Sequence, residues 1–416
     1  MSKIDNNNVL LKVENLCQYF GLGPGRELKA VHNVSFDIHK GEVFGLVGES
    51  GCGKTTTGRS IIKLYDITSG NIYFKGVRIC AGIRSYKDAI NNARKEAAKK
   101  IAEIKASGAV DADEQIAQVK AQLKDEIAKQ RQLIKEAKHD HKNCNKMYAS
   151  EQMAKVREKY EQLIASATSE EEVKTLKKQM KEEIRIASKD RIVNKIQMIF
   201  QDPIASLDPR MTVAEIISEG LIIKGIKDKE YIREQVYKAL EQVSLVREHA
   251  DRYPHEFSGG QRQRIGVARS IIMEPELIIA DEPISALDVS IQAQVINLLN
   301  ELRSELGLTI LFIAHDLSVV KYFSDRIGVM YFGNMVELAT SDDLFAHPLH
   351  PYTRSLLSAI PLPDPIYEKS RKRITYNPLA EHDYSQQAPS FREVSPGHFV
   401  MCNDVEFERY QQELKK

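Results

Sequence analysis

The sequence predicts an α/β fold built around a mainly parallel β-sheet, and two observations lead to this prediction. Short, almost wholly apolar runs have the length and composition of strands that are buried on both faces: residues 43–47, 277–280 and 309–313. Helical patterns alternate with these runs, as at residues 289–306, and the first run leads directly into a glycine-rich turn. Strand-like segments around residues 11–13 and 71–74 predict an additional β-rich lobe.

The composition indicates a soluble globular protein of two or three domains. The chain has 416 residues, of which 42% are hydrophobic and 28% are charged. Its 59 Lys and Arg residues balance 58 Asp and Glu residues, so a polyanion such as DNA is not expected as a partner. No apolar run reaches the roughly 18 residues that a membrane-spanning helix needs, and the N-terminus lacks the apolar stretch of a secretory signal. Five scattered cysteines suit a reducing cytosol.

Residues 85–190 differ sharply from the rest of the chain. They contain 23 Lys and Arg residues and 19 Asp and Glu residues, no proline, and a single glycine, Gly108. Apolar residues recur there at helical spacing, which predicts an inserted helical hairpin or small bundle with thin, coiled-coil-like seams. Breaks are expected at Ser107–Gly108, at residues 139–145 and at Thr168–Ser169. A charged, partly disordered helix in water is the alternative.

The middle of this insert holds His139, His141 and Cys144, a spacing that could contribute to zinc ligation. Three such residues in a polar turn are more often solvated. The insert could contact a partner protein, a membrane surface or a neighbouring subunit, and its small excess of positive charge does not select among these. The tail from about Pro361 is rich in proline and polar residues, which predicts loose order.

The strongest local signal is Gly48–Thr55, which fits the phosphate-loop pattern G-x4-G-K-[ST] between a predicted strand and a predicted helix. Glycines let successive backbone N–H groups converge on phosphate oxygens, and the helix N-terminus adds positive potential. Lys54 can reach the β- and γ-phosphates, and the Thr55 hydroxyl can ligate Mg²⁺. An ordinary strand–helix turn would not need the Lys-Thr pair at its end.

A second signal is the apolar run Leu277–Ala280, which ends in two adjacent acids. The carboxyl ends of parallel strands meet at one edge of a sheet, so Asp281 and Glu282 are expected beside the phosphate loop. Asp281 would hold Mg²⁺, and Glu282 could polarise the attacking water as a general base. Without the phosphate loop, such a pair would more often be a loop or a helix cap.

A third signal is Phe257–Gln261, a Ser-Gly-Gly sequence at a helix start that forms another backbone anion site. One nucleotide does not need two phosphate cradles in one chain, but two subunits facing head to tail could share them. With these three motifs in this order, the chain resembles the ABC transporter ATPase family. The first signature position is Phe257 where the family usually has leucine.

The resemblance implies further roles. Gln201 matches the Q-loop glutamine, which contacts Mg²⁺ or water, and His315 matches the switch histidine that contacts the γ-phosphate. Phe20, or less strongly Tyr19, matches the aromatic residue that stacks on adenine. The implied catalytic residues are Glu282, His315 and Gln201, and the metal-binding residues are Thr55, Gln201 and Asp281. The implied ATP-binding residues are Phe20, Gly48, Ser50, Gly51, Cys52, Gly53, Lys54, Thr55, Thr56, Ser258, Gly259, Gly260, Gln261 and Asp288.

Two segments, Gln197–Pro203 and His347–Thr353, look like the oligopeptide/dipeptide importers, and the phosphate loop is most similar to their F-type ATP-binding subunit. The resemblance implies a heterodimer with a D-type ATPase, two transmembrane permease subunits and an extracytoplasmic peptide-binding protein, with this chain on the cytoplasmic face of the membrane. Many relatives carry a C-terminal cysteine cluster for an iron–sulfur centre. Here only Cys402 lies in that region, so no cluster is expected.

Four parts are therefore expected: a first ATPase part at residues 1–84, the helical insert at 85–190, a second ATPase part at 191–345 and a transporter-type tail at 346–416. A DNA-associated ATPase of the SMC type is the alternative, because such proteins also interrupt the ATPase with coiled coil. Their coiled coils are much longer and follow the Q-loop, whereas this insert precedes Gln201.

Overall fold

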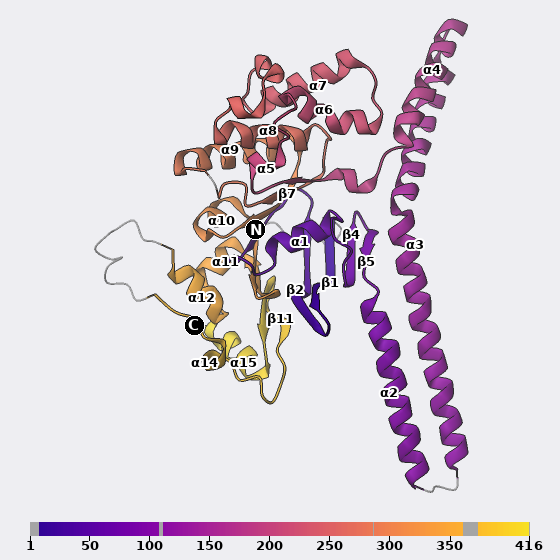
Figure 1. Ribbon diagram of the computed structural model, residues 1–416, viewed down its shortest axis with the longest axis vertical. Coiled ribbons are helices and arrows are strands. Elements are labelled where there is room, and N and C mark those ends of the chain that lie inside the picture. The colour runs from indigo at the N-terminus through magenta and orange to yellow at the C-terminus, as the bar shows by residue number, and fades with distance from the viewer. Residues whose placement is uncertain (1–7, 108–110, 286, 361–372, 416) are drawn as a thin grey trace.

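The computed structural model describes residues 8–107, 111–285, 287–360 and 373–415, and Figure 1 shows their arrangement. An eight-stranded sheet has the order β11-β12-β10-β9-β3-β8-β7-β6. Its strands are β3 (Val43–Val47), β6 (Ile196–Ile199), β7 (Leu277–Asp281), β8 (Thr309–Ala314), β9 (Arg326–Tyr331), β10 (Asn334–Thr340), β11 (Ser390–Ser395) and β12 (His398–Cys402). The strands from β9 to β6 are parallel, and β10, β12 and β11 extend the sheet in antiparallel fashion. The predicted parallel α/β fold is confirmed.

A second, four-stranded antiparallel sheet has the order β2-β1-β4-β5. Its strands are β1 (Val9–Gly23), β2 (Arg26–His39), β4 (Ser69–Phe74) and β5 (Val77–Ala81). The predicted β-rich lobe is therefore present, and it packs against one face of the larger sheet.

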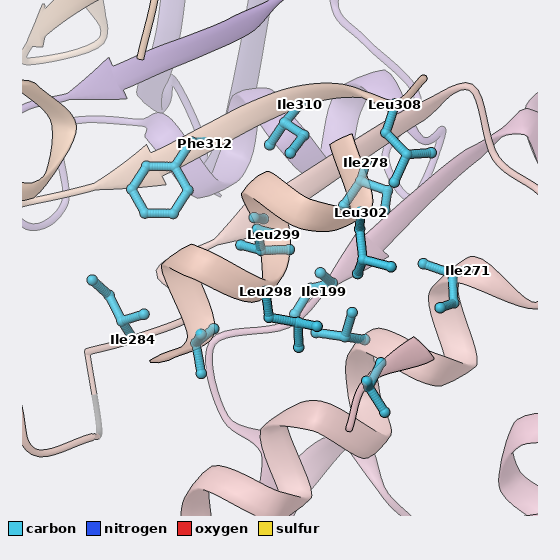
Figure 2. Packing of buried hydrophobic residues seen from close by; sticks show 14 of the residues in the cluster. Ile199, Ile271, Ile278, Ile284, Leu298, Leu299, Leu302, Leu308, Ile310 and Phe312 are labelled. Atoms are coloured by element: carbon cyan, nitrogen blue, oxygen red, sulfur yellow. The ribbon is translucent and has the colours of Figure 1, made fainter. Parts of the chain in front are cut away.

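Alternate residues of the central strands serve two different cores. On one face, Ile278, Ile310 and Phe312 pack against Leu298 and Leu299 of α9, as Figure 2 shows. On the other face, the neighbouring residues of the same strands join the core beneath the β-rich lobe: Leu277, Ile279, Leu311 and Ile313. Strands buried on both faces need apolar residues at every position, and this explains why these runs show no alternation in the sequence.

Helices cover the sheets and form a helical region beside the main sheet. Their bounds are α1 (Lys54–Ile61), α5 (Pro203–Ser206), α6 (Val213–Lys224), α7 (Lys229–Gln242), α8 (Gly259–Ile271), α9 (Val289–Leu306), α10 (Leu317–Phe323), α11 (Ser341–Ala346), α12 (Pro351–Ser358), α14 (Pro378–Glu381) and α15 (Asp404–Glu413). Short 3₁₀ turns occur at Ile192–Lys195, Arg247–Asp251 and Pro254–Glu256. None of the described helices is long and apolar enough to span a membrane.

The insert consists of α2 (Arg84–Ser107), α3 (Ala112–Ser166) and α4 (Glu170–Ala187). The expected break at residues 139–145 is wrong, because α3 continues through them without interruption. This stretch has no glycine or proline, and it docks on the β-rich lobe, where Cys144 is buried and Asp140 pairs with Arg78 at 2.6 Å. Tertiary packing thus favours the helical conformation in a polar stretch that looked like a turn.

The helices of the insert pack as two hairpins that share α3 (Figure 1). At 1.5 Å per residue, the 55 residues of α3 span about 80 Å. α2 runs beside one end of α3 and α4 beside the other, and the middle of α3 lies against β5. Few side chains on α2 and α3 are buried, and half of them are alanines: Ile90 and Ala97 on α2, and Ala137, Cys144, Ala149 and Tyr160 on α3. The predicted helical insert is confirmed, and it takes the form of two hairpins on one long helix.

The predicted loose order of the tail is wrong for residues 373–415, while residues 361–372 lie outside the described part of the chain. β12 pairs with β10 of the main sheet, and β11 pairs with β12. Apolar side chains of these strands pack with α15 and with Leu349 in a small core. The buried residues of this core are Leu349, Val394, Val400, Cys402 and Tyr410. The polar composition of the tail concealed this core because it consists of only a few apolar residues.

Candidate nucleotide site

The phosphate loop connects the end of β3 to the start of α1. Gly48 and Gly53 have φ angles of +148° and +105°, a region that L-residues rarely adopt. A Cβ on Gly48 would lie 2.2 Å from the Met330 carbonyl oxygen, and one on Gly53 would lie 2.3 Å from the Ala30 carbonyl oxygen. Both backbone conformation and space therefore require glycine at these positions. Gly51 also has a positive φ, of +82°, but it is exposed and open.

Lys54 opens α1 and is only 3% exposed. Its ammonium Nζ donates hydrogen bonds to the carbonyl oxygens of Gly48, at 2.8 Å, and Glu49, at 3.0 Å. Nζ also lies 3.9 Å from a carboxylate oxygen of Glu282. A charged amine is thus held at the centre of the loop by weak carbonyl acceptors, and phosphate oxygens can replace these acceptors.

Asp281 ends β7, and its carboxylate faces the phosphate loop. The Thr55 hydroxyl donates to Asp281 Oδ1 at 2.7 Å, whereas Oδ2 is buried and has no hydrogen-bond partner in the described structure. Burial raises the pKa of Asp281 above its ordinary value. A buried, unsatisfied carboxylate oxygen beside a hydroxyl fits a hard divalent cation, since Mg²⁺ binds oxygen ligands and would supply the missing charge compensation. Thr55 and Asp281 therefore suit the predicted Mg²⁺.

Glu282 lies at the centre of a cluster drawn from three different strand ends. Gln201 follows β6 and donates from Nε2 to Glu282 Oε2 at 3.0 Å, and His315 Nδ1, after β8, lies 3.3 Å from the same oxygen. The Glu282 N–H donates to the Ile313 carbonyl at 2.9 Å, and its φ of +45° is uncommon for a residue with a side chain. The carboxylate is therefore held in place from both the backbone and the side chains.

The signature motif forms a second group, at the start of α8. Ser258 is the N-cap residue, and its side chain and that of Gln261 form a reciprocal capping box. Asp288 caps the neighbouring α9 by accepting from the Ile291 N–H at 3.2 Å. A Cβ on Gly260 would lie 2.6 Å from Ile291 Cγ2, so the two helix starts touch. In the described residues no hydrogen bond or ion pair joins this group to the phosphate loop.

The other predicted nucleotide-binding residues differ in accessibility. Ser50 is exposed, Thr56 is half-buried, and the Cys52 thiol is buried, so Cys52 can serve a phosphate only through its backbone. Phe20 is half-buried and packs edge-on against Tyr65, with ring centroids 5.3 Å apart. Tyr19 instead hydrogen-bonds His32 Nδ1 through its hydroxyl at 2.5 Å. Of these two candidates for adenine stacking, Tyr19 is therefore held by a polar bond within the lobe, and Phe20 is not.

His139, His141 and Cys144 lie on the continuous helix α3 and do not converge. His139 is exposed, while the Cys144 thiol is buried toward the Ile79 carbonyl. Within the described ranges, no group of three His, Cys, Asp or Glu side chains is arranged to hold a metal ion. Cys402 is a buried free thiol whose pKa is raised by burial to about 11.

One contact to the phosphate loop was missed by sequence reasoning. The Tyr352 hydroxyl, on α12, accepts a hydrogen bond from the Glu49 N–H at 3.0 Å. Tyr352 belongs to the segment His347–Thr353, which the sequence marked only as a subfamily feature. No sequence signal links two residues that lie 303 positions apart.

This fold and cluster define a P-loop nucleoside triphosphatase, in which a phosphate loop, a buried aspartate and a neighbouring glutamate share one sheet edge. The ABC transporter family matches residues 31–163 and 160–285, and the C-terminal region of oligopeptide/dipeptide transporters matches residues 336–388. The chain belongs to the ABC transporter family, as the oligopeptide/dipeptide type of ATP-binding protein.

Similar proteins match almost the whole chain. The oligopeptide transport ATP-binding protein OppF of Bacillus subtilis (strain 168) is 46% identical over 96% of this chain and 98% of its own length. OppF of Streptococcus mutans is 41% identical over 98% of this chain and 99% of its own length. The dipeptide transport ATP-binding protein DppF of Lactococcus lactis subsp. cremoris is 40% identical, over 97% and 96% respectively. The predicted family is confirmed, and the SMC-type alternative has no support.

Proposed function

We propose that this chain is the ATP-binding and ATP-hydrolysing subunit that drives an importer of oligopeptides or dipeptides. The observation that carries the ATPase function is the position of Glu282, within hydrogen-bonding distance of Gln201 and His315 and 3.9 Å from the Lys54 ammonium. The peptide substrate is inferred from the relatives, because substrate selection belongs to other subunits of such transporters.

The phosphate loop binds the nucleotide in this proposal. Its backbone N–H groups and the start of α1 cradle the phosphates, and Lys54 exchanges its carbonyl partners for β- and γ-phosphate oxygens. Thr55 and Asp281 would hold Mg²⁺, with Gln201 as a further ligand, and the metal ion would supply positive charge beside the phosphates. Phe20, or alternatively Tyr19, stacks on the adenine ring.

Glu282 acts as the general base. Its carboxylate takes a proton from the attacking water, which Gln201 and His315 orient toward the γ-phosphate. Both side chains already contact this carboxylate, which supports a shared role at the attacking water. His315 then stabilises charge that develops on the γ-phosphoryl group.

The signature group serves the second nucleotide site of a dimer. Gly259 and Gly260 offer first-turn N–H groups of α8, which have no backbone partner within the helix and can meet the γ-phosphate bound by another subunit, and the N-cap Ser258 lies directly before them. Asp288 lies beside them, at the dimer interface. The second subunit is a D-type ATPase. Two permease subunits and an extracytoplasmic peptide-binding protein complete the complex, which places this chain on the cytoplasmic face of the membrane.

The parts of the chain divide these tasks. Residues 1–84 and 191–345 make up the ATPase, residues 85–190 form a separate helical insert, and residues 346–416 form the transporter-type tail. The insert contacts a partner protein, the membrane surface or the neighbouring subunit. Normal transport by a complex that lacks residues 85–190 would contradict an essential role for the insert.

The decisive experiment compares two Glu→Gln variants in the complex isolated from membranes. Glu282→Gln removes the base but keeps the shape, so ATP should still bind while turnover falls by about 100-fold or more. Glu276→Gln is the matched control, since Glu276 pairs with Lys75 at the surface, and it should change turnover less than twofold. Unchanged turnover in Glu282→Gln rejects Glu282 as the base, and a complex without permeases rejects the transport function.

A further inference from the structure

The C-terminal tail reaches the nucleotide site through one side chain. Tyr352 is 1% exposed, and its hydroxyl accepts the Glu49 N–H hydrogen bond at 3.0 Å. The carbonyl oxygen of Glu49 accepts hydrogen bonds from Lys54 Nζ, at 3.0 Å, and from the Cys52 N–H, at 3.3 Å. The peptide groups on both sides of Glu49 are therefore held, and Tyr352 supplies the contact that comes from outside the loop.

The Tyr352 ring is held firmly by other aromatic rings. Its centroid lies 4.4 Å from that of Tyr331, which ends β9 beside the phosphate-loop strand, and 5.5 Å from that of Tyr376 in the tail. A tyrosine packed on two rings has little freedom to move its hydroxyl, so the hydroxyl presents a fixed acceptor to the loop. Burial raises the pKa of Tyr352, and the hydroxyl stays protonated and neutral.

The helix that carries Tyr352 is itself fixed by the tail. His350 caps α12 by accepting from the Tyr352 N–H at 3.1 Å. The fully buried Glu337 accepts from the N–H groups of Leu349, at 2.8 Å, and His350, at 3.0 Å, and also contacts His398 Nε2 of β12 at 2.8 Å. On the other side, Arg354 of α12 pairs with Glu413 of α15. These contacts connect the tail strands and helix to the position of the Tyr352 hydroxyl.

We propose that Tyr352 is a positioning residue for the phosphate loop, through which the C-terminal tail sets the affinity of the site for nucleotide. Glu49 itself is exposed, and its N–H is the first loop amide after Gly48. If the hydroxyl is absent, this N–H loses its acceptor and the first turn of the loop is free to rotate. The loop amides that bind phosphate then have to be ordered by the nucleotide, at the expense of affinity. Tyr352 does not touch the groups around Glu282, so the hydrolytic step is left intact.

The test is Tyr352→Phe in the full-length chain, which removes the hydroxyl and keeps the ring. Titration with a fluorescent ATP analogue should give a Kd about three- to tenfold higher, as expected for the loss of one hydrogen bond. In the complex isolated from membranes, KM for ATP should rise by a similar factor while kcat stays within twofold. The matched control is Tyr376→Phe, because the Tyr376 hydroxyl makes no hydrogen bond within the described residues, and its Kd should equal that of the parent.

Thermal unfolding of both variants separates positioning from packing. A purely structural role lowers the midpoint of Tyr352→Phe without changing Kd, and this result overturns the proposal. An equal rise of Kd in both variants, or a fall of kcat at constant KM, also overturns it. The inference rests on the proposed ATP-binding function, but the two can fail separately. Nucleotide binding without turnover in the parent complex rejects the ATPase function alone, and the Kd comparison still decides the role of Tyr352.

Discussion

The two glycine-rich helix starts of this chain are built in opposite ways. The phosphate loop lies at the buried edge of the sheet, where Gly48 and Gly53 have positive φ angles and no room for a Cβ. The signature start at α8 has ordinary backbone angles at Gly259 and Gly260. A Cβ on Gly259 would meet Leu287 Cδ2 at an ordinary 3.7 Å, and one on Gly260 would approach a side-chain atom, Ile291 Cγ2 at 2.6 Å, and no backbone oxygen. One loop is shaped by the packing of its own chain, and the other is an ordinary capped helix end on the surface.

This difference shows which half of a nucleotide site the chain builds by itself. The phosphate loop gathers Lys54, Asp281, Glu282 and, through Tyr352, the tail into one cluster. Within the described residues, the signature start bonds to its own capping residues, and its two glycines lie beside Leu287 and Ile291, near the start of α9. A preorganised pocket with an exposed, separate anion site is the arrangement expected if each dimer site combines the phosphate loop of one subunit with the signature of another.

The largest effect is expected from a Gly→Ala change in the phosphate loop, compared with the same change at the signature start. Gly53→Ala places a Cβ 2.3 Å from a backbone oxygen at a φ of +105°, which should cost at least about 3 kcal/mol and abolish nucleotide binding. Gly259→Ala should fold and bind nucleotide normally but lose turnover in the assembled complex. Thermal unfolding and nucleotide titration measure both variants. Equal loss of binding in the two would remove the contrast between the loops.

A smaller effect is expected for Lys54→Ala. The change removes the charged donor at the centre of the phosphate loop, so nucleotide binding should weaken by about 2 to 3 kcal/mol. Titration with a fluorescent ATP analogue gives this value directly. Lys12→Ala, in a surface pair with Glu14, is the control and should bind as the parent does. Parental affinity in Lys54→Ala would show that the loop binds phosphate through its backbone alone.

The free energy of unfolding should also depend on pH through His350, which caps the helix that carries Tyr352. Burial lowers the pKa of His350 from 6.5 to about 3, with smaller contributions from the neighbouring His382 and Arg354. As the pH falls, the unfolded chain therefore binds the proton at a higher pH than the folded chain does. The contribution of His350 to the free energy of unfolding is complete above pH 6.5. It falls by about 1.4 kcal/mol for each pH unit below this, down to about pH 3.

The measurement is urea unfolding between pH 7 and pH 5. Other groups titrate in this range, so the informative quantity is the difference in pH dependence between the parent and His350→Asn. Asparagine can still cap α12 but carries no titratable group. A parallel pH dependence in the two proteins would contradict the role given to His350.

The smallest expected effect is at the signature start. Ser258→Ala removes the N-cap of α8 and should lower the free energy of unfolding by about 1 kcal/mol. Because the phosphate loop is separate, the affinity of the isolated chain for nucleotide should not change. Urea unfolding and nucleotide titration of the same preparation give both values. A weaker Kd in the isolated chain would show that the two helix starts are coupled within one subunit.

Local patterns predicted the elements whose residues lie close together in the sequence. The strand before Gly48, the strand before Asp281 and the helix that begins after Ser169 were all expected, since each depends on a short apolar run or a capping residue. The continuity of α3 through residues 139–145 was not expected. That stretch is polar, and its helical conformation depends on packing against a lobe that precedes it in the chain.

The sequence by itself determined the class of fold, the phosphate loop and the order of the ATPase motifs. Glycine, lysine and paired acids at these spacings occur together in few sites other than nucleotide sites. Only the tertiary structure decided that Gln201, Glu282 and His315 meet, since three strand ends have to be aligned at one sheet edge. It also decided that Tyr352 bonds to the loop at Glu49. Such contacts depend on how strands and helices hundreds of residues apart pack together, and a local pattern of residue types does not specify that packing.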